Sequence, residues 1–151
     1  MSKFDLQYPL ESHLITKWFT DLDIWINLVA LFAFTEFTFI DSVDTDMLTS
    51  EKTTLNKIGI TAKNLKQYNL IFCPINIRNI HWTLFVVNPK SGSCFFLDPL
   101  QSDNLHSETL IKANYLRSIL MEEAEMHNLK NIIEYDEMYC KQDNNHDCGP
   151  F

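Results

Sequence analysis

The chain has 151 residues, of which 46% are hydrophobic and 21% charged, which indicates one globular domain over residues 1–151 and excludes a disordered chain. The formal net charge is -8 and no basic run interrupts it, so nucleic-acid binding, which needs clustered lysine and arginine, is disfavoured. The chain has 3 glycines, and none belongs to a phosphate-binding loop motif.

The N-terminal part predicts helix. Apolar residues recur at helical spacing across residues 11–34, as expected for a helix with one buried face. Residues 24–40 are strongly apolar, but they include Asn27 and Glu36 and fall short of the ~20 apolar residues that span a membrane. We therefore expect a buried core helix that runs into a loop or strand, and no membrane contact.

The middle of the chain changes texture. Residues 42–67 are polar, with a short helix expected near Thr53. Three β-rich runs follow at residues 69–77, 81–88 and 93–98. The last two are joined by a proline- and glycine-containing stretch that predicts a hairpin connection. The sequence thus predicts a meander of strands.

Residues 105–128 predict an amphipathic helix, and residues 130–135 predict an edge or fourth strand. His106 and His127 are interpreted as solvated side chains of the helix region. The expected apolar face of this helix comprises Leu110, Tyr115 or Asn114, Ile119, Met121 and Ala124. Helices, a strand meander, a long helix and a final strand together predict the α+β class.

The chain contains free thiols rather than a disulfide framework. It has no CxxC motif, and its N-terminus lacks the apolar segment of a signal peptide, so a reducing compartment is expected. Two of the cysteines, Cys73 and Cys94, lie inside strand patterns and are expected to be small buried hydrophobic residues.

A catalytic arrangement can be argued from the predicted hairpin. His81 begins one strand and Asp98 follows the next, so an antiparallel pair places both at the same end of the sheet. A carboxylate there can orient the imidazole as a general base. Near the C-terminus, Cys148 precedes a glycine and is a candidate nucleophile, with Gln142 as a candidate oxyanion donor.

The same residues fall in four ordered blocks that resemble the motifs of the ubiquitin-like protease family, cysteine peptidases that remove SUMO and related modifiers. The blocks are Trp18-Phe-Thr-Asp21-Leu-Asp-Ile24, Pro74-Ile-Asn76 with His81-Trp82-Thr-Leu84, Asp98-Pro-Leu100, and Gln142-Asp-Asn144-Asn-His-Asp147-Cys148-Gly149. The resemblance extends from about residue 10 onward. It implies a papain-like architecture, with a central mixed or antiparallel sheet flanked by helices.

The resemblance also implies a role for each matching residue. Cys148 would be the nucleophile, His81 the general base, Asp98 its orienter and Gln142 the oxyanion donor. A second set would bind substrate: Trp18 and Trp82 resemble the indoles on either side of a diglycine tail, and Asp21 resembles a substrate-contacting carboxylate. No metal and no cofactor is implied.

The function implied is cleavage after the Gly-Gly of SUMO or a related ubiquitin-like modifier, either from conjugates or from a precursor. The partners would be the modifier and its conjugates, and the protein would be a monomer of the nucleus or cytoplasm. Two alternatives are a module that binds a modifier without cutting it and an acyltransferase that reuses the same histidine, acid and cysteine.

The sequence departs from the family pattern in three places. Pro99 stands where a serine is usual, and Lys141 where a second glutamine is frequent. The chain ends at Phe151, whereas in the family a helix begins at the cysteine and more structure follows. We therefore expect a C-terminally incomplete domain whose last helices are missing.

Several of these residues also have a purely structural interpretation. Trp82 alone would be assigned to the core, and Asp98 before a proline would be assigned to a turn. A zinc site at Cys140, His146 and Cys148 is disfavoured by poor ligand spacing. Three glutamates are interpreted as a solvated helix face: Glu122, Glu123 and Glu125.

Overall fold

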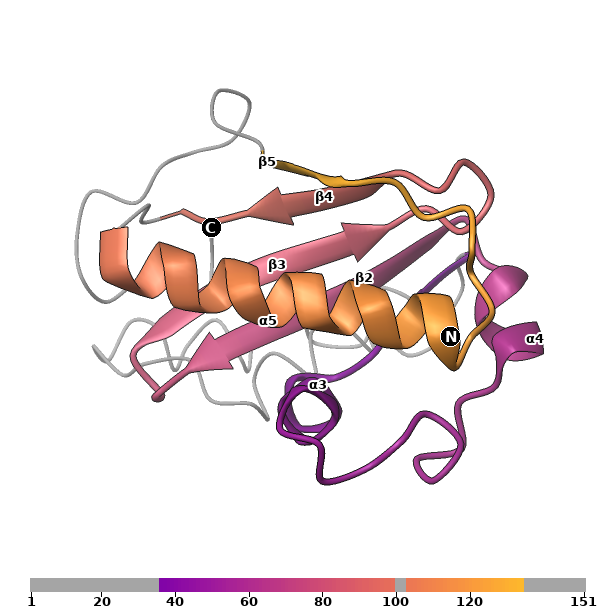
Figure 1. Cartoon of the computed structure of the whole chain (residues 1–151), viewed down its shortest axis with the longest axis horizontal. Coiled ribbons are helices and arrows are strands. Elements are labelled where there is room, and N and C mark those ends of the chain that lie inside the picture. Colours follow the sequence, from indigo (N-terminus) through magenta and orange to yellow (C-terminus); the bar gives the residue numbers. More distant parts are fainter. Residues whose placement is uncertain (1–35, 100–102, 135–151) are drawn as a thin grey trace, which may run out of the picture.

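The computed structural model of the chain describes residues 36–99 and 103–134. These residues form a five-stranded sheet in the order β1-β2-β3-β4-β5 and three helices. The elements are β1 (Phe37–Phe39), α3 (Ser42–Thr49), α4 (Ala62–Lys66), β2 (Leu70–Ile77), β3 (His81–Val87), β4 (Cys94–Leu97), α5 (Asp103–Glu122) and β5 (Ile132–Glu134). Figure 1 shows α5 lying across one face of the sheet.

The sheet is mixed. Its centre is the antiparallel meander β2-β3-β4, and the short edge strands β1 and β5 pair in parallel with β2 and β4. The three predicted strand runs agree with β2, β3 and β4 to within one residue at each end. The α+β class and the central mixed sheet are therefore confirmed.

A tight turn joins β2 to β3 and sets where β3 begins. Arg78 and Asn79 both have positive φ, at 54° and 57°, and the Ile80 N–H donates to the Ile77 carbonyl at 3.0 Å. This pair of left-handed residues is the geometry of a type I′ hairpin turn. The Asn76 side chain stabilises the turn because its Oδ1 accepts the Asn79 N–H at 2.9 Å.

The turn from β3 to β4 depends on Gly92. Its φ is +73°, and a Cβ added there would lie 2.1 Å from the backbone oxygen of Asn128. The Gly92 carbonyl also accepts the Lys130 N–H at 2.8 Å. The turn is thereby attached to the segment that leads into β5, which fixes β4 between its two neighbours.

The core lies between the sheet and α5. Alternate residues of β2, β3 and β4 point to the helix, and they are almost fully buried together with one side of α5. The sheet contributes Ile71, Cys73, Ile75, Phe85, Val87, Cys94 and Phe96, and the helix contributes Ala113, Leu116, Ile119 and Leu120.

The predicted helix at residues 105–128 is confirmed in position and wrong in its bounds, because α5 ends at Glu122. Glu125 has a φ of 53°, which turns the chain out of the helical path. The next residues still bury Met126 and Leu129 in the core, and this continued apolar pattern resembles a longer helix. Tyr115, assigned to the apolar face, is 38% exposed.

The polar segment before β2 also differs from expectation. The short helix predicted near Thr53 is not formed, and turns occupy residues 55–59 between α3 and α4. Both helices have an N-cap: the Asp41 carboxylate accepts the Asp44 N–H at 2.8 Å, and the Thr61 hydroxyl accepts the Asn64 N–H at 3.2 Å. Asp and Thr are favoured at this position.

The predicted helix at residues 11–34 lies outside the described residues. At the end of the apolar run, β1 and the buried Ile40 confirm that the run continues into a strand. Among the helices of residues 36–99 and 103–134, none is long and apolar enough to cross a membrane.

Candidate active site

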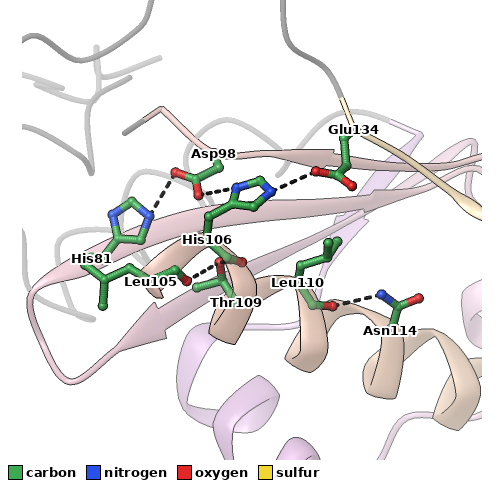
Figure 2. Close-up of polar contacts among 8 residues, drawn as sticks. All are labelled: His81, Asp98, Leu105, His106, Thr109, Leu110, Asn114 and Glu134. Atoms are coloured by element: carbon green, nitrogen blue, oxygen red, sulfur yellow. Dashed lines mark hydrogen bonds and ion pairs between the residues drawn. The ribbon is translucent and has the colours of Figure 1, made fainter. Parts of the chain in front are cut away.

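The site is built at the end of the sheet where β3 starts and β4 stops. The two strands are antiparallel, with Leu84 opposite Leu97, so the start of β3 and the end of β4 lie at the same end of the sheet. His81 Nε2 lies 2.9 Å from Asp98 Oδ1. Figure 2 shows the two side chains facing each other. The prediction that both residues lie at one end of the sheet is therefore confirmed.

Burial makes this pair unusual. The side chains of His81 and Asp98 are 0% and 1% exposed. A buried carboxylate needs partners because the loss of water is costly. The residue before a proline is restricted to extended backbone, so Pro99 limits the backbone of Asp98 and helps to hold it.

The contact also determines what the imidazole can do. When Nε2 donates its hydrogen to Asp98, a neutral ring carries its lone pair on Nδ1. Nδ1 could then accept a proton from a nucleophile, and the carboxylate would stabilise the imidazolium that forms. This arrangement suits a general base.

A second histidine joins the site, although a solvated side chain was expected at this position. His106 was interpreted as solvated, yet its side chain is 23% exposed and lies between two carboxylates. Its Nδ1 is 2.8 Å from Asp98 Oδ2, and its Nε2 is 2.7 Å from Glu134 Oε2 (Figure 2). The ring of His106 also contacts Phe96 edge-to-face, with ring centroids 5.5 Å apart.

These contacts change the acidity of His106. Burial alone favours its neutral ring, but hydrogen bonds to Glu134 and Asp98 outweigh burial and raise the pKa of His106 above its usual value. The only sequence signal that His106 could lie near Asp98 is its position in the first turn of the helix that follows Asp98. Glu134, on the far strand β5, gives no sequence signal.

Trp82 is next to His81 in β3 and is 4% exposed. Successive side chains of a strand point to opposite faces, so the indole lies on the other side of the sheet from the imidazole. The core interpretation of Trp82 agrees with this burial, and its predicted contact with a diglycine tail stays a prediction.

The other predicted site residues cannot be placed. Cys148, Gln142, Trp18 and Asp21 lie outside the described residues, and their roles stay predictions. The disfavoured zinc trio at the C-terminus is outside them too. In the part of the chain that the structure describes, no group of three His, Cys, Asp or Glu could hold a metal ion.

Two other cysteines are unsuited to be nucleophiles. Cys73 and Cys94 are free thiols that are 0% exposed, which confirms their interpretation as buried small side chains. Burial raises the pKa of both thiols, and for Cys94 the nearby Arg117 offsets only part of this effect. The thiolate is the reactive form of cysteine, so neither can attack a substrate efficiently.

Comparison with known proteins gives a coherent result. Residues 8–151 match the family described as Ulp1 protease family, C-terminal catalytic domain. A ubiquitin-like-specific protease 1B from Arabidopsis thaliana is 35% identical over 108 residues, which are 68% of this chain and 29% of that protein. The chain thus spans less than a third of the length of that relative.

Solved structures share the fold. The SUMO protease Ulp1 with a sulfenic acid at its catalytic cysteine superposes with a TM-score of 0.68 at 19% identity, over 99% of this chain and 67% of that one. The C-terminal Ulp1 domain in complex with Smt3, the yeast SUMO, has a TM-score of 0.65 at 20% identity, over 89% and 62%. The Xanthomonas campestris effector XopD bound to ubiquitin has a TM-score of 0.60 at 19% identity, over 88% of this chain and 69% of that one.

Proposed function

Because this chain belongs to the Ulp1 protease family, we propose that it is a thiol peptidase domain that cleaves after the diglycine of SUMO or a related ubiquitin-like modifier. The observation that carries the proposal is the buried His81–Asp98 contact of 2.9 Å. A family match gives the class of reaction, and this contact supplies a base with an oriented ring. The bonds cut would be the peptide bond of a precursor or the isopeptide bond of a conjugate.

The proposed reaction has two stages. His81 Nδ1 takes the proton of the Cys148 thiol, and the thiolate attacks the carbonyl carbon of the terminal glycine. The C–N bond breaks as the imidazolium gives its proton to the leaving amine, which leaves a thioester on Cys148. A water molecule, deprotonated by the same imidazole, hydrolyses the thioester and restores the thiol.

Other predicted residues would assist these stages. Gln142 would donate to the oxyanion that forms at the carbonyl, since such donors stabilise the developing charge. Trp18 and Trp82 would form a slot that admits only glycine, and Asp21 would contact the modifier near its tail. We place the domain in the nucleus or cytoplasm, as a monomer that needs no cofactor.

The partner class has support from similar proteins. The solved Ulp1 domain was captured with Smt3, and XopD with ubiquitin. These two modifiers are therefore the first to test on this chain.

The test is hydrolysis of SUMO and ubiquitin that carry a fluorogenic amide at the C-terminal glycine, in reducing buffer. We expect the wild type to release the fluorophore and Cys148→Ala to release none while still binding the modifier. Cys140→Ala is the matched control, because it removes a nearby cysteine of the same segment. Binding by the wild type without hydrolysis of any modifier would contradict the peptidase and favour the module that only binds.

A further inference from the structure

The polar contacts around His81 and Asp98 extend to two side chains that the proposed reaction does not use, His106 and Glu134. The Asp98 carboxylate contacts two imidazoles, with His81 on Oδ1 and His106 on Oδ2, and His106 contacts Glu134 with its other nitrogen. The four side chains come from β3, the end of β4, α5 and β5. Figure 2 shows them as one chain of polar contacts.

The protons of this cluster can be counted. A neutral imidazole has one N–H, but both nitrogens of His106 lie within 2.8 Å of a carboxylate oxygen. Carboxylates are acceptors at neutral pH, so both contacts are hydrogen bonds only when His106 is an imidazolium. A cation is therefore the form of His106 that satisfies both neighbours.

The backbone carbonyl of His106 also has a partner within its own helix. Thr109 is fully buried, and its hydroxyl donates to the carbonyls of Leu105 and His106, each at 2.9 Å. The T-shaped contact with Phe96 limits the ring on the side of the sheet. The imidazole ring of His106 is therefore fixed by three contacts, with Phe96 at its edge and a carboxylate at each nitrogen.

We propose that His106 is a positioning residue, an imidazolium held by Glu134 that fixes the Asp98 carboxylate for His81 and partly neutralises its charge. This inference rests on the proposed function, since it gives His106 a part in the same reaction. The two bonds on opposite oxygens stop the Asp98 carboxylate from rotating. The ring of His81 then keeps the orientation in which Nδ1 accepts a proton.

The charge of His106 has a second effect. An unshared carboxylate stabilises the protonated form of His81 and so raises its basicity, whereas a carboxylate shared with a cation does so less. His81 must both take a proton and return it to the leaving amine, and a moderate basicity serves both steps.

The arrangement predicts a pH dependence. The described titratable groups that face His106 are Asp98 after β4 and Glu134 on β5, with His81 of β3 beyond Asp98. As the pH rises through the raised pKa of His106, the ring loses one proton and one of its two bonds. Glu134 is 49% exposed, so water and salt screen its contact with His106, whereas the Asp98 carboxylate on the other side of the ring is buried.

Two variants separate the bond from the charge. In His106→Gln the side-chain amide keeps a donor for Asp98 but carries no charge. In His106→Leu both are lost. His127→Gln is the matched control, because His127 is an exposed histidine outside the cluster.

The first measurement is a pH titration of the imidazoles by long-range 1H–15N NMR, which needs no turnover. We expect both nitrogens of His106 to be protonated below its raised pKa, Glu134→Gln to lower that pKa, and His106→Gln to raise the pKa of His81. His127→Gln should change neither. A neutral His106 at pH 6 would overturn the proposal. The same pKa of His81 in wild type and His106→Gln would overturn it too.

The second measurement is the rate at which a modifier with a C-terminal electrophile labels the protein. His106→Leu should lower the maximal rate about tenfold with little change in affinity, as expected for an outer group that orients a functional side chain. His106→Gln should keep most of the labelling rate. Its rate should no longer change with pH in the range where His106 titrates in the wild type. Equal rates and pH profiles in wild type and His106→Leu would also overturn the proposal.

The two arms distinguish two failures. If neither the wild type nor any variant is labelled, the proposed function fails. The NMR titration then still decides whether His106 is a cation that contacts Asp98. If the wild type is labelled and the NMR titration shows a neutral His106, the peptidase stands and the role of His106 is wrong. Glu134→Gln changes only an exposed side chain, so it remains informative if His106→Leu does not fold.

Discussion

At the scale of single residues, the centre of the site is the carboxylate of Asp98. It is 1% exposed, and two imidazole nitrogens lie within 2.9 Å of its oxygens. Such a group is stable in the interior only because its partners replace water. Its neighbours therefore decide both its orientation and how strongly it acts on His81.

Asp98→Asn is expected to lower the labelling rate at least ~100-fold, because an amide cannot hold the imidazole in the tautomer that has its lone pair on Nδ1. The measurement is the initial rate of probe labelling at several pH values, with circular dichroism to check the fold. Asp46→Asn is the matched control, because Asp46 pairs with Lys112 at the surface and is 50% exposed. Unchanged labelling in Asp98→Asn would contradict the role of Asp98.

His106 also makes stability depend on pH. Its folded-state pKa is raised above the ordinary 6.5, so the stabilising contribution is fully present below 6.5 and is lost as the pH rises through the folded value. We expect the unfolding free energy of wild type to exceed that of His106→Gln most near pH 6, and the difference to shrink toward pH 9. Urea denaturation at each pH measures it. A difference that grows with pH would have the wrong sign.

At the scale of elements, the turn between β3 and β4 is the most constrained. Gly92 and Gly59 have similar positive φ, at +73° and +78°. A Cβ added at Gly92 would collide with the Asn128 backbone, whereas a Cβ added at Gly59 would have nothing within 4 Å. Alanine at either site meets a similar conformational cost of about 1–2 kcal/mol. The difference between the two substitutions therefore isolates the contact with Asn128.

Gly92→Ala is expected to destabilise the protein by about 1–3 kcal/mol more than Gly59→Ala, the range of overpacking a well-packed site. The measurement is the urea midpoint of each variant. Because the turn positions β4, Gly92→Ala should also lower the labelling rate, while Gly59→Ala should not. Equal midpoints for the two variants would contradict the close approach at Gly92.

The elements differ in how well the sequence predicts them. The strands β2, β3 and β4 have strong β-rich runs, and their hairpin turns are local, so the meeting of His81 and Asp98 could be predicted. The short edge strands β1 and β5 also agree with predictions, since the apolar run to residue 40 was expected to end in a loop or strand and residues 130–135 to form an edge or fourth strand. Their parallel pairing with β2 and β4 joins distant segments, which no local pattern reports. The predicted end of the long helix was wrong because the buried residues after α5 continue its apolar pattern.

His106 shows a second limit. Its role depends on Glu134 of β5, whose position beside β4 is a tertiary result of the parallel pairing at the sheet edge. A histidine in the first turn of an amphipathic helix gives no indication of this strand pairing. The sequence could therefore predict that His81 and Asp98 meet, but not that His106 and Glu134 join them.

At the scale of the whole molecule, α5 and the sheet form one core that also carries the site. The helix brings His106 to Asp98 because Leu116 and its buried neighbours pack against β2 and β3. Stability and site geometry are therefore linked through the same contact surface.

Leu116→Ala should lower the unfolding free energy by about 2–5 kcal/mol, since it removes a fully buried side chain. Ile111→Ala, on the same helix but 69% exposed, is the matched control and should change it by less than about 0.5 kcal/mol. Thermal and urea unfolding measure both. Similar losses in the two variants would contradict the packing of α5.

The most direct test of the whole account is to treat the chain with SUMO that carries a C-terminal electrophile and to locate the adduct by mass spectrometry. The account predicts one adduct, on Cys148, that is lost in Cys148→Ala, retained in Cys140→Ala, and slowed in His81→Ala and Asp98→Asn. An adduct on a different cysteine, or labelling that His81→Ala leaves unchanged, would contradict the claim that His81 and Asp98 activate Cys148.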